Sequence, residues 1–206
     1  MAAPFESPAP AVAQRLFIAL PLPDTVKAQL KRVRYPIAGF AWVPPENLHL
    51  TMRFLGEVAA ERRTALEARL AGVRVEPFIL PVEGTGAFPP RRPPRVVWVG
   101  TGRSHPRLFQ LRQRLDDALL MGGFDVDMRS FHAHVTVARL GPDTRDLANQ
   151  WVIENEEFIG PPFRVEGFGL YSSLPGPEGS RYTLERWFAF EPETPDIALA
   201  AGGTPA

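Results

Sequence analysis

One eight-residue pattern occurs twice in this chain, and it constrains the fold more than any other feature. Residues 49–56 read His-Leu-Thr-Met-Arg-Phe-Leu-Gly and residues 134–141 read His-Val-Thr-Val-Ala-Arg-Leu-Gly, so both follow His-x-Thr-x-x-x-Leu-Gly. The copies begin 85 residues apart, and each comes at the same point of an alternation of strand-like and helix-like segments. We therefore expect two similar halves related by a pseudo-twofold axis.

Hydrophobic periodicity predicts the order of elements around the two motifs. The expected strands are 15–20, 48–55, 76–84, 96–99, 130–138, 163–171 and 182–190, and the expected helices are 24–33, 59–71, 105–121 and 143–153. The Pro/Arg-rich segment 88–95 cannot form a central strand and is expected to be an extended connector. The pattern predicts an α+β fold in which two antiparallel-rich sheets line a central groove, with the helices outside.

Both ends of the chain lack this periodicity. Residues 1–13 are rich in Ala and Pro, and residues 191–206 are similar, so we expect two flexible tails around a single bilobal domain at 14–190. The first residues contain neither a basic stretch nor an apolar run, and no apolar run reaches the roughly 18 residues that a membrane span requires. We expect a cytoplasmic protein without a membrane partner.

Composition excludes several classes of function. The chain has no cysteine, which excludes disulfides, thiolate metal sites and a cysteine nucleophile. Its 23 basic and 23 acidic residues cancel, so bulk charge does not hold it on nucleic acid or an anionic membrane. Only Lys27 and Lys31 are lysines, which leaves 21 of the 23 basic residues as arginine, the side chain that binds phosphate in a bidentate manner. A local basic groove therefore remains compatible with the composition, as does a general bias toward arginine.

The residue types in the repeated motif suit phosphate chemistry. Residues i and i+2 of a strand point to the same face, so His49 lies beside Thr51, and His134 beside Thr136. If the halves face each other, two imidazoles and two hydroxyls surround one small space. The hydroxyls can donate to phosphate oxygens, while one neutral and one protonated histidine act as general base and general acid. This scheme requires no metal and no cofactor.

Histidine spacing also leaves a metal site open as an alternative. His132 is two residues before His134, and His-x-His is a spacing found among metal ligands, with Asp125 or Asp127 as the nearest further ligand. A single histidine on a strand is most often a packing or surface residue. The shared spacing with threonine and the matched placement argue against that interpretation for His49 and His134.

At these motifs the chain resembles the two-histidine phosphoesterases, and among them the RNA 2′,3′-cyclic phosphodiesterases, also called 2′-5′ RNA ligases. The segments RLFIALPLPDTV, WVPPENLHLTMRFLGEV, FHAHVTVARLG and FGLYSSLPGPEGSRYTLERW carry the resemblance, which covers nearly the whole expected domain. It implies a bilobal fold and hydrolysis, without metal, of a terminal ribose 2′,3′-cyclic phosphate to a 2′-phosphate. It also implies 2′-5′ ligation or cleavage of tRNA halves in vitro.

The resemblance assigns roles to particular residues. It implies that His49 and His134 are the catalytic pair and that Thr51 and Thr136 hold the phosphate. We take His134 as the base that activates water and His49 as the acid, although the pseudo-symmetry leaves the order open. The expected partners are RNA ends that carry a 2′,3′-cyclic phosphate, tRNA fragments among them, and the expected state is a monomer.

Residues near the second motif are harder to place. Arg139 matches an arginine that contacts the nucleotide in this family, but strict strand parity turns it away from His134 unless the strand is irregular between them. Ala133 stands where the family usually has proline, a change in support rather than in function. In the first motif, Phe54 is expected in the core, and Arg53 has no assigned role.

Two other functions remain as alternatives. One is a two-histidine enzyme for small cyclic nucleotides or 2′-5′ oligonucleotides, and the other is a nucleotide or RNA sensor without catalysis. The candidates for contacts with RNA beyond the reacting ribose are Arg91, Arg92 and Arg95 of the connector and, if it is exposed, Trp98. A solvated loop and a buried strand are the simpler interpretations of these residues.

Overall fold

The computed structural model describes residues 13–102, 105–126, 130–177 and 179–191. The helices are α1 (Asp24–Leu30), α2 (Ala60–Leu70), α3 (Pro106–Met121) and α4 (Arg145–Glu154), with short 3-10 turns at Lys31–Val33 and Pro45–Asn47. The strands are β1 (Gln14–Pro21), β2 (Phe40–Trp42), β3 (His49–Val58), β4 (Phe78–Glu83), β5 (Thr85–Phe88), β6 (Val96–Gly100), β7 (His134–Leu140), β8 (Ile159–Val165), β9 (Gly167–Leu174) and β10 (Arg181–Ala189). This is the expected α+β class with antiparallel sheets, while the predicted tails lie, except for Ala13 and Glu191, outside the described residues.

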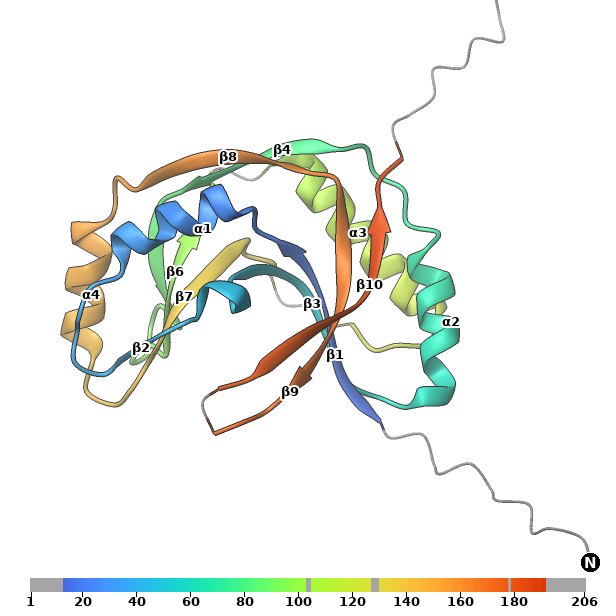
Figure 1. Cartoon of the computed structure of the whole chain (residues 1–206), viewed down its shortest axis with the longest axis horizontal. Helices are drawn as coiled ribbons and strands as arrows, with labels where there is room; N and C mark the ends of the chain where they lie inside the picture. Colours follow the sequence, from blue (N-terminus) through green and yellow to red (C-terminus); the bar gives the residue numbers. More distant parts are fainter. Residues whose placement is uncertain (1–12, 103–104, 127–129, 178, 192–206) are drawn as a thin grey trace, which may run out of the picture.

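The two halves meet in one eight-stranded sheet (Figure 1). Its order is β10-β9-β1-β3-β7-β6-β5, with β2 also pairing with β7, and each pair is antiparallel. Strands β10, β9, β1 and β3 belong to one half, and β7, β6, β5 and β2 to the other. Among the described residues, the two halves of this sheet are paired at Leu50 of β3 and Val135 of β7, so the sheet consists of two four-stranded parts that share a narrow junction.

A row of buried aliphatic residues crosses this junction. Leu20 pairs with Leu50, Leu50 with Val135, and Val135 with Val99, which places four residues side by side on β1, β3, β7 and β6. None of them is more than 1% exposed. Because neighbouring residues of a strand point to opposite faces, this row directs the residues on either side of Leu50 and Val135 away from the core. The hydrophobic core thus determines which face the two His-x-Thr motifs present.

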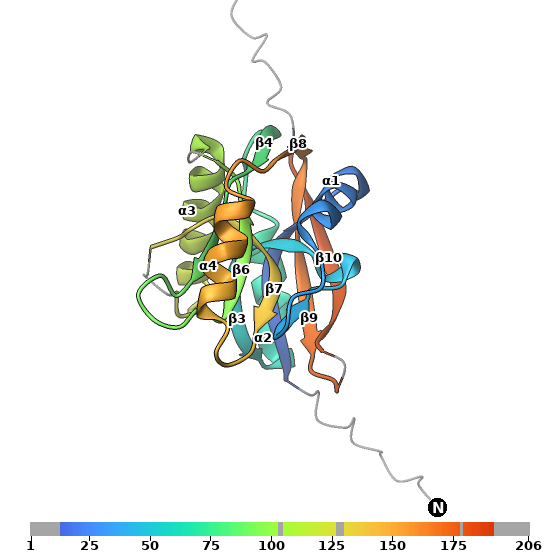
Figure 2. The ribbon, with the colours of Figure 1, turned by 90° about the vertical axis from the view of Figure 1, so that its left-hand side faces the viewer.

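Three of the helices lie at the two ends of the molecule, and α1 lies between them against β8 (Figures 1 and 2). Helices α2 and α3 pack side by side at one end, and α4 lies at the other end against β5. Trp151 of α4 is fully buried and donates from Nε1 to the carbonyl of Val33, which ties α4 to the turn after α1. Among the described residues, no helix is long and apolar enough to cross a membrane.

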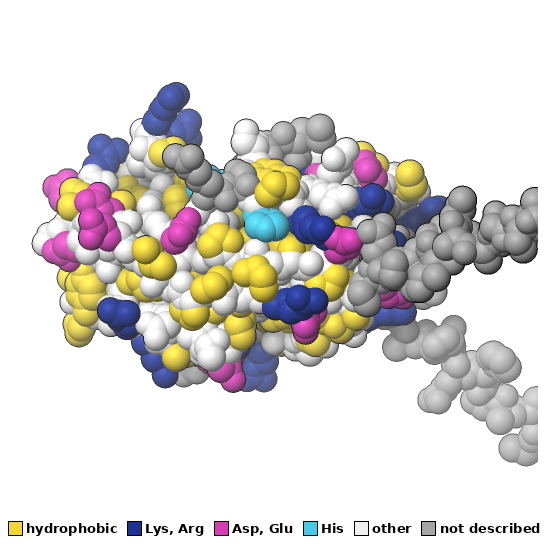
Figure 3. Space-filling view, turned by 90° about the horizontal axis from the view of Figure 1, so that it is seen from above, with side chains coloured by type: hydrophobic (Ala, Val, Ile, Leu, Met, Phe, Trp, Pro, Cys, Tyr) yellow, Lys and Arg dark blue, Asp and Glu magenta, His cyan; other side chains and the backbone are white. Residues whose placement is uncertain are grey.

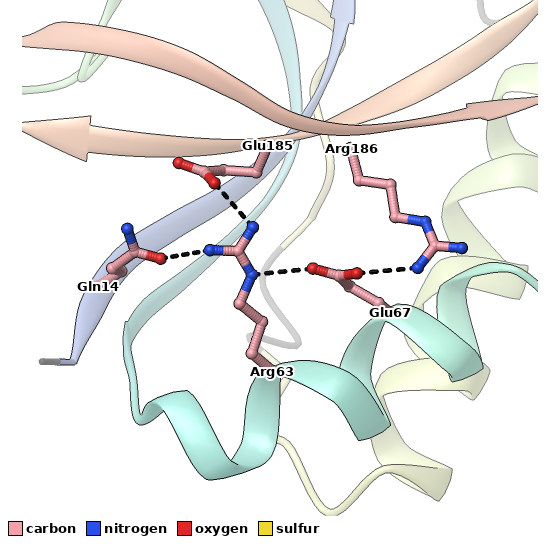
Figure 4. Close-up of polar contacts among 5 residues, drawn as sticks. All are labelled: Gln14, Arg63, Glu67, Glu185 and Arg186. Carbon is pink, nitrogen blue, oxygen red and sulfur yellow. Dashed lines mark hydrogen bonds and ion pairs between the residues drawn. The ribbon is translucent and has the colours of Figure 1, made fainter. Parts of the chain in front are cut away.

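A network of ion pairs and hydrogen bonds fixes α2 to strands β1 and β10 (Figure 4). Arg63 donates to Gln14 of β1, to Glu67 one turn further along α2, and to Glu185 of β10. Glu67 in turn accepts a hydrogen bond from Arg186 of β10. Burial opposes the charged form of Glu67, but its contacts with the two arginines prevail and lower its pKa below the ordinary value.

Strands β4 and β8 form a separate two-stranded sheet. The sequence predicted a single strand over 163–171, but the chain breaks at Glu166, so that 163–165 end β8 and pair with β4 while β9 pairs with β10. The apolar pattern continues across Glu166, so no pattern in the sequence indicates that the paired strand changes there. The face that carries β4 and β8 shows scattered hydrophobic side chains, with basic and acidic side chains dispersed over it (Figure 3).

Three further differences from the prediction concern short or irregular strands. Strands β2 and β5 were not predicted, because stretches of three and four residues are too short to show periodicity. Strand β7 begins at His134 rather than at residue 130. The predicted connector 88–95 begins inside the sheet, because Phe88 is the last residue of β5 and pairs with Val96, and at its end the Arg95 carbonyl accepts a hydrogen bond from Leu140 N.

Candidate active site

The two repeated motifs occupy equivalent places in the structure. The first seven residues of β3 and the seven of β7 share one order of burial: half-buried, buried, half-buried, buried, buried, exposed, half-buried. In both strands the half-buried first and third positions are the histidine and the threonine of the motif. The repeat in the sequence is therefore also a repeat of local structure.

A β-bulge interrupts each motif one residue after the threonine. In β3, Ala19 pairs with Thr51 and Ile18 with Arg53, which leaves Met52 as the extra residue. In β7, Trp98 pairs with Thr136 and Val97 with Ala138, which leaves Val137 as the extra residue at the equivalent position. A bulge reverses the alternation of the side chains that follow it.

The second bulge decides where Arg139 points. Strict parity would have turned Arg139 to the face opposite His134, but the extra residue at Val137 returns it to the same face, where it is exposed. Its positive charge reaches His49 and contributes to lowering the pKa of that imidazole. The structure thus brings Arg139 to the paired histidines.

The first bulge has the same consequence for Arg53 and Phe54, which are buried and exposed like Ala138 and Arg139 at the equivalent positions. Arg53 is only 4% exposed and forms an ion pair with Asp116 of α3, so it belongs to the structural support of the site. Phe54, which was expected in the core, is 71% exposed and shares the face of Thr51. Phe54 is the counterpart of Arg139 in the repeat, because the same spacing separates each from its histidine.

A charged cluster holds the first bulge in place. Asp116 accepts hydrogen bonds from Arg53 Nε at 2.8 Å and from Arg112 Nε at 3.1 Å. Arg112 also donates from Nη1 to the carbonyl oxygen of Met52, the bulged residue. This cluster anchors the strand immediately behind Thr51 and Phe54.

Both histidines are oriented by the same type of contact. His49 Nδ1 lies 2.7 Å from the carbonyl oxygen of Asn47, and His134 Nδ1 lies 2.7 Å from that of His132. Since a carbonyl oxygen only accepts, each Nδ1 carries the proton and each Nε2 is left as the atom available for chemistry. His49 Nε2 lies 3.0 Å from Thr51 Oγ1, which can donate to the neutral ring. The side chain of Asn47 also donates to the Ser180 carbonyl, which connects this support to the loop before β10.

The surroundings favour the neutral form of both rings. Burial lowers the pKa of His49 below its ordinary value; the Asn47 carbonyl opposes this, and the positive charges of Arg139 and His134 reinforce it. Burial also lowers the pKa of His134; the His132 carbonyl opposes the shift and the charge of His132 reinforces it. An anion placed between the rings would offset these effects by favouring their charged forms.

Aromatic rings that were not predicted enclose His49. The ring of Phe17 lies 5.0 Å from the imidazole between centroids, and Tyr182 meets the imidazole edge-on at 5.2 Å. Phe17 also stacks on Tyr171 at 5.4 Å. These residues come from β1, β9 and β10, so only the pairing of distant strands assembles them. All three lie in segments that carried the family resemblance, Phe17 in the first and Tyr171 and Tyr182 in the last, but nothing in those segments indicated that the rings meet at His49.

A second aromatic group encloses His134. Phe88 lies 5.1 Å from the imidazole and Trp98 6.0 Å, and the ring of His132 lies 4.7 Å from Trp98. Trp98 is half-buried, and its Nε1 is a buried donor without a partner among the described residues. A Cβ at Gly86 would lie 2.2 Å from the Trp98 ring, so only glycine allows the indole this position. Trp98 therefore packs under His134 rather than standing free as a stacking platform.

A cavity of about 570 Å³ opens beside the paired motifs. Thr51 and Phe54 line it from one half, and Phe88, His132 and His134 from the other. Thr136 follows His134 on the same strand face, opposite Trp98 in register. Of the predicted site residues, Thr51 and His134 line this cavity beside the exposed ring of Phe54, whereas His49, Thr136 and Arg139 are not part of its wall.

The side chains around His132 and His134 do not form the ligand group that the alternative metal site would need. His132 precedes β7 rather than lying on it, and its ring contacts Phe88 and Trp98. Across the described part of the chain, no three His, Cys, Asp or Glu side chains are grouped so that they could hold a metal ion. Asp127, one of the two aspartates considered as a third ligand, lies outside the described residues.

Sequence comparison relates the chain to one family. The model of the family described as LigT like phosphoesterase matches residues 20–98 and 101–182. An RNA 2′,3′-cyclic phosphodiesterase of Archaeoglobus fulgidus is 35% identical over 180 residues, which cover 84% of this chain and 99% of the relative. The RNA 2′,3′-cyclic phosphodiesterase of Escherichia coli is 32% identical over 183 residues, which cover 84% and 96%.

Solved structures show the same similarity. E. coli LigT in complex with 3′-AMP superposes with a TM-score of 0.72 at 29% identity, over 86% of this chain and 98% of that chain. A protein of Thermus thermophilus superposes with a TM-score of 0.74 at 31% identity, over 87% and 100%. The arrangement of strands and helices described above is therefore shared with these proteins over nearly their whole length.

Proposed function

This chain belongs to the LigT-like phosphoesterase family, and on that premise we propose that it is an RNA 2′,3′-cyclic phosphodiesterase, which opens the cyclic phosphate at an RNA end to leave a 2′-phosphate. The observation that supports this most directly is the pair of equivalent imidazoles, each with Nδ1 on a backbone carbonyl and Nε2 available. A site that only binds phosphate has no need for two imidazoles held in this way, whereas acid–base catalysis requires both.

The proposed reaction needs one proton acceptor and one proton donor. His134 Nε2 takes a proton from water as the water oxygen attacks phosphorus. The bond from phosphorus to the 3′ oxygen breaks, and this oxygen receives a proton from His49 Nε2. The 2′ oxygen keeps the phosphate.

The neighbouring side chains would hold the phosphate during this exchange. Thr51 and Thr136 donate to its non-bridging oxygens, so the Thr51 hydroxyl leaves His49 Nε2 when the substrate enters. Arg139 balances the negative charge from the same face. The bound phosphate raises the pKa of His49, which then carries the proton that the 3′ oxygen needs.

The reaction class is tested with a short RNA that ends in a 2′,3′-cyclic phosphate, incubated with and without EDTA. We expect equal turnover in both and a product with only a 2′-phosphate. A 3′-phosphate product would overturn the proposed mechanism. Loss of turnover in EDTA, restored by added metal, would return the metal alternative.

The role of the histidines is tested by single substitutions with a matched control. His49→Ala and His134→Ala should each lower kcat by about 10²–10⁴-fold, the usual contribution of a positioned acid or base. His132→Ala is the control, because His134 Nδ1 contacts the backbone carbonyl of His132, which the substitution retains. Comparable loss in all three variants would contradict the assignment.

The order of the two histidines needs a different substrate. A cyclic phosphate with sulfur in place of the 3′ oxygen releases a thiolate, which requires no proton. On this substrate His49→Ala should lose much less activity than on the natural one, while His134→Ala should lose as much as before. The reverse pattern would exchange the two roles.

Finer aspects of the proposal concern the partner and the setting. RNA ends are the proposed substrate, with the ends of tRNA fragments as one physiological source, and the proposed state is a cytoplasmic monomer. Light scattering on the purified protein and cell fractionation test the last two points. Turnover of 2′,3′-cyclic mononucleotides without turnover of RNA would favour a small-nucleotide enzyme instead.

A further inference from the structure

Two adjoining cavities flank the connector between β5 and β6. The first, of about 600 Å³, lies between the connector after β5 and helix α4, and the second, also of about 600 Å³, lies between the connector and the end of β7. They share Pro94 and Arg145 in their walls. Figure 2 shows the connector as the green loop beside α4.

Arginine dominates the charged groups in both walls. We call the following five residues the arginine track: Arg91, Arg92, Arg95, Arg139 and Arg145. Asp143 is the one acidic residue that lines either cavity. In a chain whose 23 basic and 23 acidic residues cancel, five to one is a strong local excess that produces a positive surface potential.

The structure does not use these arginines to stabilise the fold. Many arginines elsewhere form ion pairs with carboxylates, among them Arg53, Arg63 and Arg186, but within the described part of the chain those of the track form none. All five are exposed. Arg145 is the first residue of α4, where a positive charge opposes the helix dipole, so helix stability does not account for it either.

The connector presents its arginines on a restricted backbone. Four of the seven residues 89–95 are proline, which fixes backbone dihedral angles. Arg95 anchors the end of the segment, since its N–H donates to the Phe88 carbonyl and its own carbonyl accepts from Leu140. Less conformational entropy is therefore lost when a ligand binds here than at a flexible loop.

The track begins at the proposed catalytic site. Arg139 lies next to Arg95, because Val96 pairs with Arg139 and Leu140 N donates to Arg95 O. Arg139 is also the residue whose charge reaches His49. A phosphate chain that leaves the histidines past Arg139 would therefore meet Arg95 next, and then the walls formed by the connector and α4.

We propose that the arginine track binds the backbone of the single-stranded RNA that leads to the reacting end. This inference rests on the proposed function, and it adds the direction in which the strand leaves the site: past Arg139 and Arg95, then between the connector and α4. It follows that the enzyme distinguishes an RNA end from a cyclic mononucleotide by phosphates upstream of the one that reacts. Backbone binding of this kind is independent of base sequence and strongly dependent on salt.

The test compares two substrates in one pair of variants. The substrates are 2′,3′-cyclic AMP and an RNA of about ten nucleotides that ends in the same cyclic nucleotide, within the length range that single-strand sites cover. The track variant is Arg91→Ser/Arg145→Ser, which removes one arginine from each wall of the first cavity and none from the catalytic site. The control is Arg69→Ser/Arg114→Ser, which removes two exposed arginines from α2 and α3.

We expect the track variant to raise KM for the RNA and to leave kcat/KM for 2′,3′-cyclic AMP unchanged. Two lost phosphate contacts should flatten the slope of log KM against log salt by about 1.4, since each contact to a single strand contributes about 0.7. Between about 50 and 200 mM salt, the wild type should then lose about sevenfold more affinity than the variant. The control variant should behave like the wild type with both substrates.

Other outcomes separate this inference from the proposed function. Unchanged KM and salt dependence for the RNA, with turnover intact, would overturn the track while the phosphodiesterase assignment stands. An equal loss on both substrates would also overturn it, because the effect would then lie at the catalytic site. If neither substrate is turned over, fluorescence anisotropy with the labelled RNA decides: weaker binding only in the track variant supports the track, and equal binding in all three proteins overturns it.

Discussion

The charged cluster behind the first motif allows a quantitative prediction about stability. Asp116→Ala removes a carboxylate that forms ion pairs with both Arg53 and Arg112, and the Arg53 side chain concerned is only 4% exposed. Removing one partner of a buried ion pair costs about 3–5 kcal/mol. Because the Asp116 side chain is itself 24% exposed, water screens part of the interaction, and we expect the lower end, about 3 kcal/mol.

This loss is measurable by urea unfolding, followed by tryptophan fluorescence. For a protein of this length, about 3 kcal/mol also corresponds to a fall in Tm of about 6–12 °C. The matched control is Asp117→Ala on the same helix, since Asp117 is exposed and forms no ion pair within the described part of the chain. The control should change stability by less than about 0.5 kcal/mol. Equal stability of the two variants would refute the view that Asp116 holds a buried charge in place.

Two further predictions concern catalysis. Catalysis requires one neutral and one protonated histidine, and burial lowers the pKa of both His49 and His134. In the free enzyme this state therefore forms only below the ordinary histidine pKa, and the bell-shaped pH profile of kcat/KM should centre below about pH 6.5. A centre above pH 7 would contradict the lowered pKa values. Phe54→Ala should raise KM for the RNA about 5- to 150-fold, which is the effect of removing a ring on which a base stacks. Tm should change little because the ring is 71% exposed, and an unchanged KM would exclude base stacking on Phe54.

Much of the fold was accessible from the sequence because the relevant signals are local. Helices α2, α3 and α4 were predicted to within two residues at each end, since each carries an apolar stripe with the helical period. Strand pairing carries no such signal. The break at Glu166 and the short strands β2 and β5 exist only because other strands supply the hydrogen bonds.

The contrast is sharpest at the site itself. The spacing His-x-Thr, repeated after 85 residues, predicted that His49 and Thr51 share one strand face and that His134 and Thr136 share another, and the matching burial of β3 and β7 agrees with that parity. That the two pairs act together on a phosphate stays a prediction. The expectation that Phe54 lies in the core was wrong, and strict strand parity would have placed Arg139 on the wrong face. Each error has the same source, an extra residue after the threonine that no local pattern announces.

The sequence by itself determined that a histidine and a threonine lie side by side twice in this protein, because side-chain type and the two-residue period are properties of a single strand. Only the tertiary structure decided which residues surround these pairs. Register against β1 and β6 creates the bulges that expose Phe54 and Arg139, and pairing across the sheet brings the aromatic rings to the histidines. The arginine track likewise depends on tertiary structure, because the connector and α4, about fifty positions apart in the chain, line the same cavity. The overall charge of the chain is zero, so composition does not indicate this local excess of positive charge.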